Sequence, residues 1–546
     1  MIRLALAQVN TTVGDLRGNV EKITAALEKS RREEADVVLF PELCLTGYPP
    51  EDLLFNKSFI RKTIASLKKI LPHTKSICAV IGLPIEDGGK LYNAAAVISK
   101  GEIEYMAKKS ELPNYGVFDE KRYFVPGEQN SLVKIAGVNV AITICEDIWV
   151  PDGRTAALCG KPETGLIFNL SSSPFHIGKM DERRGIARTW AKKFKTHLAY
   201  CNLVGGQDEL VFDGGSFVCD PKGEIISSSA EFGESLHIVD LPLGGGNKKG
   251  EAKKASVTPL FEYPENVFEA LKTGVRDYVE KNGFTKALIA LSGGIDSALT
   301  ATVAVAALGA DRVRGVSMPS RYSSQGSISD AKELAGALGI KMDVIPITPL
   351  MDGFDAALEN TFAETEPGIT EENLQARIRG ALIMAMSNKF GYLVLSTGNK
   401  SELSVGYCTL YGDMAGGFAA IKDLPKTLVY ELSNWINDQE NLPDIPRSII
   451  EKEPSAELRP DQKDSDSLPE YRVLDPILKF YVEDEKSVEE IISLGYSERD
   501  VAKAVRLVDF NEHKRRQAPL GVRITPKAFG RDRRVPITNR FREWEK

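Results

Sequence analysis

The sequence lacks the features that would assign it to a membrane, a secreted or a metal-cluster class. Its 546 residues contain no apolar run near the roughly 20 residues that cross a bilayer. The opening segment, MIRLALAQVN, has neither the basic start nor the apolar stretch of a signal peptide, so we expect a cytoplasmic protein. The seven cysteines form no Cys-x-x-Cys pair and only five histidines occur. These counts argue against a disulfide framework, a zinc site and a histidine-based metal centre.

An excess of charge of either sign is also missing. The chain has 69 basic and 76 acidic residues, a net charge of −7 at pH 7 with histidine neutral. This balance gives no basic surface for nucleic acid and no polybasic patch for a membrane, so we expect neither partner. The length is too great for one core, and at roughly 100–200 residues per domain it predicts about two to four domains.

A change of composition near the middle of the chain marks a domain boundary. Residues 244–258, GGGNKKGEAKKASVT, are rich in glycine and lysine and carry almost no apolar side chain, which is typical of an exposed linker. We therefore expect one domain over 1–243, a linker over 244–260 and a second domain over 261–546. A further polar run, 451–471, is either a mobile surface loop or a segment that becomes ordered over a ligand.

Both predicted domains are of the α/β class. Upstream, short strand patterns alternate with helical patterns at 19–33, 57–70 and 181–195. Downstream, longer helices separate four strand candidates, which predicts a doubly wound parallel sheet. The upstream strand candidates are 4–9, 37–40, 77–82, 94–99, 138–144, 166–169, 197–202 and 215–219, and the downstream ones are 287–291, 312–317, 341–346 and 391–396.

The stretch ALIALSGGIDSALT, which begins at Ala287, is the most informative motif of the downstream half. A buried strand enters a small glycine-rich turn, and an apolar helix follows. Glycine lets the backbone approach a ligand closely, and the free N–H groups of a helix start favour a phosphate. The turn lacks the Gly-Lys-Ser/Thr ending of a Walker loop. An ordinary turn with glycines for close packing is the alternative.

The turn resembles the SGGxDS loop of the ATP pyrophosphatases, which split ATP into AMP and pyrophosphate. The downstream sheet would then be of the adenine nucleotide alpha hydrolase type. The resemblance implies that ATP contacts Leu291, Ser292, Gly293, Gly294, Ile295, Asp296 and Ser297.

Three segments of the upstream half carry a lone reactive group beside a predicted strand. Glu42 lies in VVLFPELCL, Lys109 in MAKKSELP and Cys145 in NVAITICEDIW. Their order and spacing resemble the Glu-Lys-Cys triad of the nitrilase superfamily over nearly all of residues 1–240, which implies an αββα sandwich that hydrolyses amides or nitriles. A buried cysteine that is only a small hydrophobic residue is the alternative for Cys145. Lys108 is a neighbouring lysine, but the KxxLP spacing favours Lys109.

The resemblance also implies a role for each group. Glu42 takes the proton of the Cys145 thiol and returns it to the leaving ammonia. Lys109 and a main-chain N–H group beside Cys145 stabilise the oxyanion. Glu120 matches the family's second glutamate, which orients the lysine and the attacking water.

The segment NLSSSPFHIGK, residues 169–179, resembles the glutamine-using members of the nitrilase group. By that match Ser173 and Lys179 hold the polar end of glutamine, and Tyr115 lines the same pocket. A cation suits an α-carboxylate because a charge-assisted hydrogen bond is stronger than a neutral one. A turn with a solvated lysine remains the alternative for Lys179.

The segment STGNKSELSVGYC follows a predicted strand and resembles the second phosphate and magnesium element of NAD synthetases. It places Thr397 and Glu402 at a carboxyl strand end, where open α/β sheets bind ligands. Asp296 and Glu402 would hold Mg²⁺, which prefers hard oxygen ligands. The alternatives are a helix acid for Glu402 and a helix cap for Thr397. Lys426 matches a lysine on the ATP phosphates, and Ser455 lies in the segment that resembles a mobile lid.

The remaining matches concern a dinucleotide. Asn373 and Arg377, on a predicted helix, align with NAD synthetase contacts to deamido-NAD, and Glu402 would contact the same substrate. His513 and Lys514 lie in KRRQAPLGVRIT and its flank, which resemble the tail of glutamine-dependent NAD synthetases. A solvated basic tail or an RNA-binding patch is the other interpretation of this cluster.

The order of the two halves resembles that of the glutamine-dependent NAD synthetases. Such a ligase consumes deamido-NAD, ATP, glutamine and water and gives NAD, AMP, pyrophosphate and glutamate, with Mg²⁺. Ammonia would pass between the sites inside the protein, and the resemblance implies a homo-oligomer. Two alternatives remain open: another glutamine-dependent amidotransferase with the same ATP loop, and a tRNA-modifying ATP pyrophosphatase, whose tRNA binding would be salt-sensitive.

Overall fold

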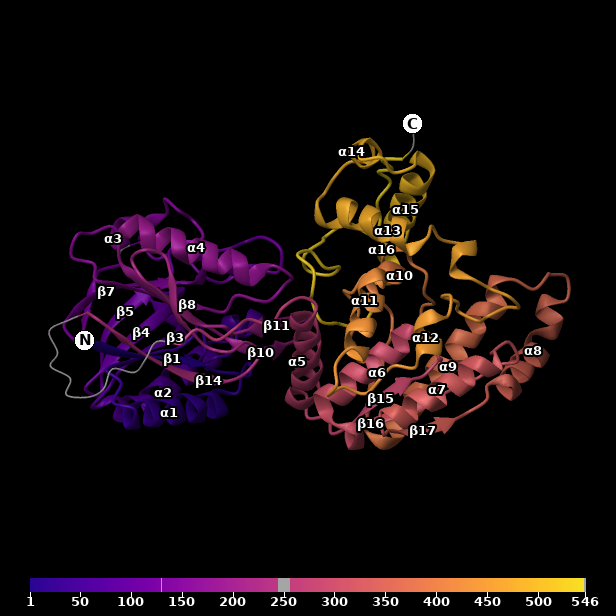
Figure 1. The fold of residues 1–546 in the computed structure, drawn as a ribbon, viewed down its shortest axis with the longest axis horizontal. Coiled ribbons are helices and arrows are strands. Elements are labelled where there is room, and N and C mark those ends of the chain that lie inside the picture. Colours follow the sequence, from indigo (N-terminus) through magenta and orange to yellow (C-terminus); the bar gives the residue numbers. More distant parts are fainter. Residues whose placement is uncertain (129, 244–255, 545–546) are drawn as a thin grey trace. The chain divides into compact units, whose positions relative to one another are not determined.

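The computed structural model describes residues 1–128, 130–243 and 256–544 in two compact units, Met1–Phe261 and Glu262–Lys546. Figure 1 shows their elements, and each unit is considered by itself. Most of the expected linker, residues 244–255, lies outside the described residues. Its last part belongs to the first unit, because Val257 pairs with Ser228 and Thr258 exchanges hydrogen bonds with the same residue.

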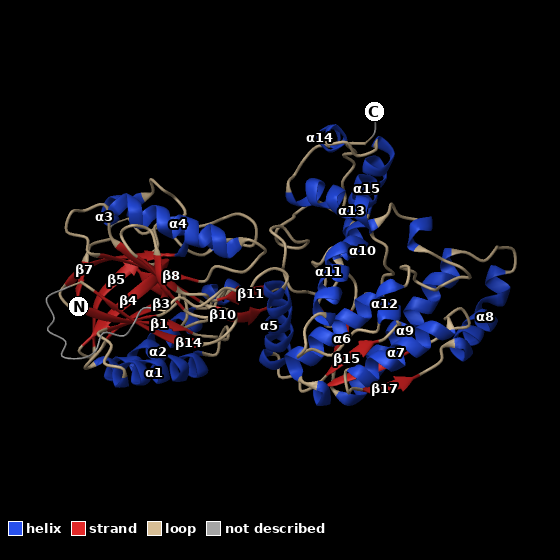
Figure 2. Cartoon of the chain, in the orientation of Figure 1, coloured by secondary structure: helices blue, strands red, loops and turns tan. Residues whose placement is uncertain are grey.

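Two six-stranded sheets form the centre of the first unit (Figure 2). The first has the order β14-β1-β2-β3-β4-β5 and the second the order β13-β12-β9-β8-β7-β6. The first sheet consists of β1 (Ile2–Gln8), β2 (Val37–Leu39), β3 (Cys78–Asp87), β4 (Lys90–Ser99), β5 (Glu102–Lys108) and β14 (Ser235–Leu241). The second consists of β6 (Val133–Ile135), β7 (Val138–Ile144), β8 (Leu166–Ser171), β9 (His197–Asn202), β12 (Phe217–Cys219) and β13 (Ile225–Ser228). A hairpin of β10 (Val204–Gln207) and β11 (Leu210–Asp213) accompanies them.

Alternating side chains of the strands pack on both faces of the two sheets in this unit. Leu4 and Leu6 of β1 pack between the two sheets, against Ile142 and Phe168 of the second sheet. Ala5 and its neighbours face the other way, toward α1 (Leu16–Arg32) and α2 (Lys57–Ile70). The outer face of the second sheet is covered by α3 (Arg154–Cys159) and α4 (Lys179–Phe194). The result is the expected αββα sandwich.

The second unit contains a parallel five-stranded sheet of order β17-β16-β15-β18-β19. Its strands are β15 (Ala287–Ala290), β16 (Val313–Ser317), β17 (Lys341–Val344), β18 (Leu393–Ser396) and β19 (Phe418–Ala419). Its helices are α5 (Glu265–Lys281), α6 (Ile295–Leu308), α7 (Gln325–Ala337), α8 (Thr348–Phe362), α9 (Ile369–Phe390), α10 (Lys400–Val405), α11 (Lys426–Asn437) and α12 (Arg447–Glu451). The chain order reverses between β15 and β18, so the segments that follow these two strands flank the switch point at which such sheets bind ligands. This is the expected doubly wound arrangement.

The last part of the chain forms a small helical layer with its own core. It comprises α13 (Tyr471–Leu478), α14 (Val488–Ser493), α15 (Glu498–Phe510) and α16 (Glu512–Arg515). Lys400, at the start of α10, joins this layer to the sheet through ion pairs with Glu483 at 2.7 Å and Asp423 at 3.0 Å. The chain beyond the layer returns to the sheet, where Gly521 pairs with Ala419.

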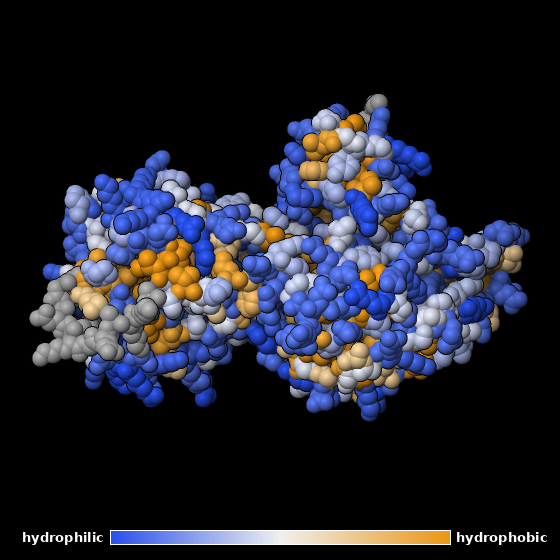
Figure 3. Space-filling view, viewed as in Figure 1, coloured by the Kyte–Doolittle hydropathy of each residue, from blue (hydrophilic) through white to orange (hydrophobic). Residues whose placement is uncertain are grey.

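Hydrophilic side chains cover most of the face shown in Figure 3. Among the residues that the structure describes, no helix combines the length and the apolar composition needed to cross a bilayer.

Candidate active sites

The first unit brings Glu42, Lys109 and Glu120 into one buried cluster. Glu42 follows β2 and Lys109 follows β5, so both lie at strand ends. The ammonium Nζ of Lys109 is 2.7 Å from Glu42 Oε1 and 2.8 Å from Glu120 Oε1. Lys108 takes a different direction and pairs with Asp87 at 2.7 Å. The fold thus distinguishes the two adjacent lysines as the KxxLP spacing does.

The charges of this cluster depend on one another. Burial alone would lower the pKa of Lys109, but Glu120 and Glu42 raise it well above its usual range, so the lysine stays charged. Burial raises the pKa of Glu120 to about 7, and the neighbouring ammonium opposes the rise. The site therefore holds a permanent cation next to two carboxyl groups.

Cys145 begins a tight helical turn directly after β7, with a φ of 42°, a left-handed value that non-glycine residues rarely adopt. The Asp147 carboxylate supports this turn, because it accepts hydrogen bonds from the main-chain N–H groups of Ile144, Ser110 and Glu111 at 2.8–2.9 Å. Asp147 thereby ties the cysteine segment to the chain that follows Lys109. Burial, and then the charge of Glu42, raise the pKa of the Cys145 thiol. The thiol therefore needs a base to become a nucleophile.

The side chains expected to bind glutamine lie near this thiol. Tyr115 Oη donates at 3.1 Å to the carboxylate of Glu146, the residue directly after Cys145. The Lys179 ammonium lies 3.8 Å from the centre of the Trp149 ring and pairs with Glu182 at 2.9 Å. Burial lowers the pKa of Lys179.

Ser173 is held by residues that the sequence did not reveal. Its Oγ accepts a hydrogen bond from Arg183 Nε at 3.0 Å, and its N–H donates to Asn202 Oδ1 at 2.9 Å. Arg183 is fully buried, pairs with Asp213 at 2.6 Å and donates to the carbonyl groups of Ser173 and Pro174. The one signal in the sequence is its spacing: Arg183 falls on the same helix face as Ala187 and Trp190, which the structure buries.

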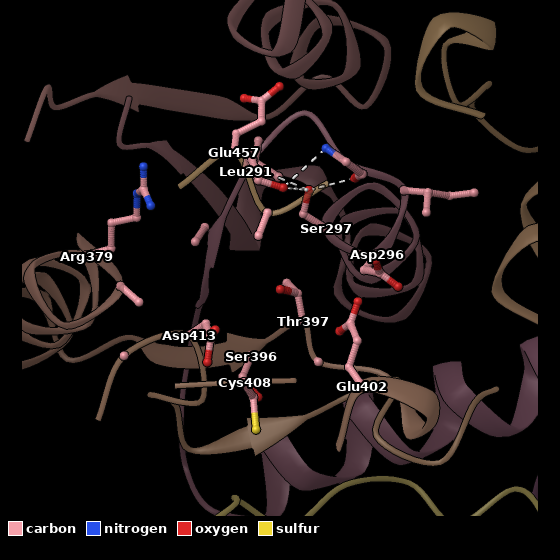
Figure 4. Close-up of a pocket in the computed structure, with 18 of the residues that line it drawn as sticks. Leu291, Asp296, Ser297, Arg379, Ser396, Thr397, Glu402, Cys408, Asp413 and Glu457 are labelled. Carbon is pink, nitrogen blue, oxygen red and sulfur yellow. Dashed lines mark hydrogen bonds between the residues drawn. The ribbon is translucent and has the colours of Figure 1, made fainter. Parts of the chain in front are cut away.

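The second unit has a cavity of about 300 Å³ at the carboxyl ends of its strands (Figure 4). Ser292 and Ser297 join the two ends of the glycine-rich turn, with their Oγ atoms 3.1 Å apart. Gly293 has a φ of 80° and passes so close to α7 that a Cβ atom would lie 2.2 Å from the carbonyl oxygen of Ser327. Of the residues predicted to contact ATP, those that line the cavity are Leu291, Ser292, Gly294, Ile295, Asp296, Ser297, Thr397, Lys426 and Ser455.

Two carboxylates of the cavity lining, those of Asp296 and Glu402, lie close to each other on one side of the cavity (Figure 4). The Lys426 ammonium lies between them, in contact with Asp296 and 3.3 Å from Glu402. Asn399 connects the same pair: its Nδ2 donates to Asp296 Oδ1, and its Oδ1 accepts from the N–H of Glu402, both at 2.9 Å. Burial, with the nearby charge of Asp296, raises the pKa of Glu402 to about 8. Two carboxylates this close favour a cation beside them, here the Lys426 ammonium, and their oxygen donors are of the kind that Mg²⁺ prefers.

The other residues expected to contact deamido-NAD lie outside the cavity lining. Asn373 accepts a hydrogen bond from Thr409 Oγ1 at 2.8 Å, and Arg377 donates to the carbonyl of Leu410 at 3.3 Å. Lys514 donates to the carbonyls of residues 406 and 408 at 2.7 and 2.8 Å, and His513 is exposed beside it. These contacts gather around loop 406–411, whose residues 407 and 408 line the cavity.

The cavity has further polar residues that the sequence did not indicate. Burial lowers the pKa of Arg379 to about 10 and raises that of Asp413 to about 6. Glu457 accepts from Ser324 Oγ at 2.9 Å and Ser327 Oγ at 2.7 Å, which attaches the polar run 451–471 to the start of α7. This run contributes to the cavity wall.

Comparison with known proteins agrees with this division of the chain. The carbon-nitrogen hydrolase family matches residues 3–247, and the NAD synthase family matches residues 267–518. The glutamine-dependent NAD(+) synthetase of Thermotoga maritima is 48% identical over 571 aligned positions, which cover 99% of each chain. The chain belongs to the glutamine-dependent NAD(+) synthetases.

Other members of this family match over the same extent. The synthetase of Aquifex aeolicus is 45% identical, covering 99% of this chain and 100% of its own. The solved structure of the synthetase from Acinetobacter baumannii, a complex with adenosine diphosphate, is 41% identical, has a TM-score of 0.77 and covers 100% of this chain and 99% of its own. The predicted family and the predicted fold class are thus confirmed.

Proposed function

We propose that this synthetase amidates deamido-NAD to NAD, with ATP as the activating co-substrate and glutamine as the nitrogen donor. ATP converts the substrate carboxylate to an acyl-adenylate and releases pyrophosphate, and ammonia then displaces AMP. One observation carries the proposal: a chain of this ligase family holds both a buried lysine–glutamate cluster, to which Asp147 ties the Cys145 turn, and a cavity beside an SGGIDS turn. The cytoplasmic location remains a prediction from the cysteine usage.

In the proposed glutaminase reaction, Glu42 accepts the Cys145 proton and the thiolate attacks the side-chain amide of glutamine. Lys109 and a main-chain N–H group stabilise the oxyanion, and Glu42 returns the proton to the leaving ammonia. Water, activated by Glu42, then hydrolyses the thioester to glutamate. The 2.8 Å contact from Glu120 supports its role in holding the lysine. Tyr115, Ser173 and Lys179 would bind the rest of glutamine.

In the second unit, the Ser292–Ser297 turn presents the start of α6 to the ATP phosphates, with Thr397 and Ser455 on other walls of the cavity. Asp296 and Glu402 would hold Mg²⁺, which when bound neutralises charge on the polyphosphate. Lys426, which balances these carboxylates in the structure, would then be available to the phosphates. Asn373, Arg377, His513 and Lys514 would contact deamido-NAD around loop 406–411, with Glu402 on the cavity side.

Two further features of the enzyme are proposed from the family resemblance and the chemistry. Ammonia would pass between the sites inside the protein, because bulk water would protonate it and dilute it. The enzyme would also be a homo-oligomer, which light scattering of the purified protein tests directly.

A coupled assay tests the proposed function. AMP release is measured with deamido-NAD, with and without glutamine, and NAD is identified as the product. We expect AMP and NAD in equal amounts when glutamine or ammonia is supplied. If deamido-NAD gave no AMP release with either glutamine or ammonia, the proposed substrate would be refuted.

A further inference from the structure

Asn93 is a buried amide in a position where an apolar side chain would be expected. It lies on β4, in the sequence LYNAAAVIS, and is 1% exposed. Side chains two and four residues further along the same strand, Ala95 and Val97, pack in the core between the two sheets. Burying an amide in such surroundings is unfavourable unless it makes hydrogen bonds, so its partners indicate its purpose.

Those partners are the two groups on which the glutaminase chemistry depends. Asn93 Nδ2 donates to Glu42 Oε1 at 2.8 Å, and its main-chain carbonyl accepts the N–H of Lys109 at 2.8 Å. Its Oδ1 is buried with no hydrogen-bond partner among the described residues. The side chain thus acts through its N–H group, which donates to the proposed base and also faces Glu120.

The two carboxylate oxygens of Glu42 consequently differ in the hydrogen bonds that they accept. Oε1 accepts from both Asn93 Nδ2 and Lys109 Nζ, at 2.8 and 2.7 Å. Among the described residues, Oε2 accepts only from the main-chain N–H of Ser172, at the longer distance of 3.1 Å. A carboxylate oxygen that already accepts two strong hydrogen bonds is a poor proton acceptor, so Oε2 is the basic oxygen.

We propose that Asn93 is a positioning residue of the glutaminase reaction: it holds Glu42 through Oε1 and leaves Oε2 for the Cys145 proton. This inference rests on the proposed function of the first unit. Lys109 cannot do this alone, because its ammonium is shared with Glu120. Asn93 supplies a second donor to Glu42 Oε1, and this donor adds no charge.

The test replaces Asn93 by leucine, which has a similar volume and no donor, in the full-length enzyme. Because a hydrogen bond to a charged group is lost, we expect kcat for glutamine hydrolysis to fall about ten- to a hundredfold, with KM changed less than about threefold. The acid limb of the pH–rate profile should move to higher pH, because the ionised carboxylate has lost a donor. The rate at which iodoacetamide alkylates Cys145, followed by peptide mass spectrometry at several pH values, should show the same shift to higher pH.

Controls separate this inference from packing effects and from the proposed function. Asn139→Leu removes a half-buried amide whose Nδ2 donates to the carbonyl of Glu163, and it should leave the profile unchanged. A lowered melting temperature would show that Asn93→Leu disturbs the fold. In that case Asn93→Ala is used instead, because it removes the same donor with a smaller side chain. A lower kcat with an unmoved acid limb, or an unchanged kcat, would overturn the inference. Glu42→Gln should abolish glutamine hydrolysis; if it does not, the proposed glutaminase mechanism itself fails.

Discussion

The Arg183–Asp213 ion pair allows a sharp prediction, because both side chains are fully buried and the geometry is complete. The guanidinium donates to both oxygens of Asp213 at 2.6 and 2.8 Å, to Ser173 Oγ at 3.0 Å and to two main-chain carbonyls at 2.7 and 2.9 Å. Asp213→Ala leaves this cation without its counterion. Removing one partner of such a pair costs about 3–5 kcal/mol.

Hydrogen exchange measured by mass spectrometry is the suitable assay, because a chain of two units has no single free energy of unfolding. A loss of about 3–5 kcal/mol corresponds to amide exchange faster by about a hundredfold to several thousandfold in peptides of β9 and β11 that open with the unit. Arg17→Met, which breaks an exposed pair with Glu21, is the matched control and should leave exchange unchanged. Exchange accelerated less than about tenfold by Asp213→Ala would refute the assignment. Recovery in the double variant Arg183→Met/Asp213→Leu would show that the stranded charge, rather than lost packing, caused the effect.

Three further predictions use other parts of the chain. Cys145→Ala should abolish synthesis from glutamine and leave synthesis from added ammonia, and loss of both would refute the proposed division of labour. Asp296→Ala should abolish synthesis from either nitrogen source while glutaminase turnover persists, as measured by AMP and glutamate release; unchanged synthesis would remove Asp296 from the Mg²⁺ site. Burial raises the pKa of Glu231 from 4.5 to about 7, so the folded state binds its proton more tightly and this contribution to stability is lost as pH rises between those values. Glu231→Gln should therefore flatten the decline of melting temperature over that range, and an equal slope in both proteins would contradict the shift.

The reactive residues were predictable because their signals are local. Glu42, Lys109 and Cys145 each lie next to a strand, and strand ends of a layered fold meet at one edge. The choice between Lys108 and Lys109 is equally local, since successive residues of an extended chain point to opposite sides. The α/β class of both units was also predictable, because the alternation of strands and helices is a local pattern in the sequence.

The supporting residues were not predictable because their meaning depends on distant partners. Asp147 is one of two adjacent acids beside Cys145, and only the packing shows that it accepts N–H groups from the segment after Lys109. Asn93 and Arg183 look like isolated polar residues until the sheets are assembled. The polar run 451–471 was expected to be a surface loop or a ligand-ordered segment; the family resemblance singled out Ser455 in it, but nothing in the composition showed that Glu457 lines the cavity.

The arrangement of Lys426 explains how two neighbouring, half-buried carboxylates are tolerated in the cavity. Asp296 and Glu402 are 106 residues apart in sequence and lie together, and the raised pKa of Glu402 shows the cost of their mutual repulsion and burial. The lysine reduces this cost, because its ammonium contacts both groups and its own pKa is raised by them in spite of burial. A divalent cation would interact with the same carboxylates more strongly than one ammonium does, since the attraction scales with charge. Mg²⁺ at the proposed site would therefore release the lysine toward the phosphates, and Lys426→Met should lower both the thermal stability of the ligand-free enzyme and the rate of AMP release from ATP.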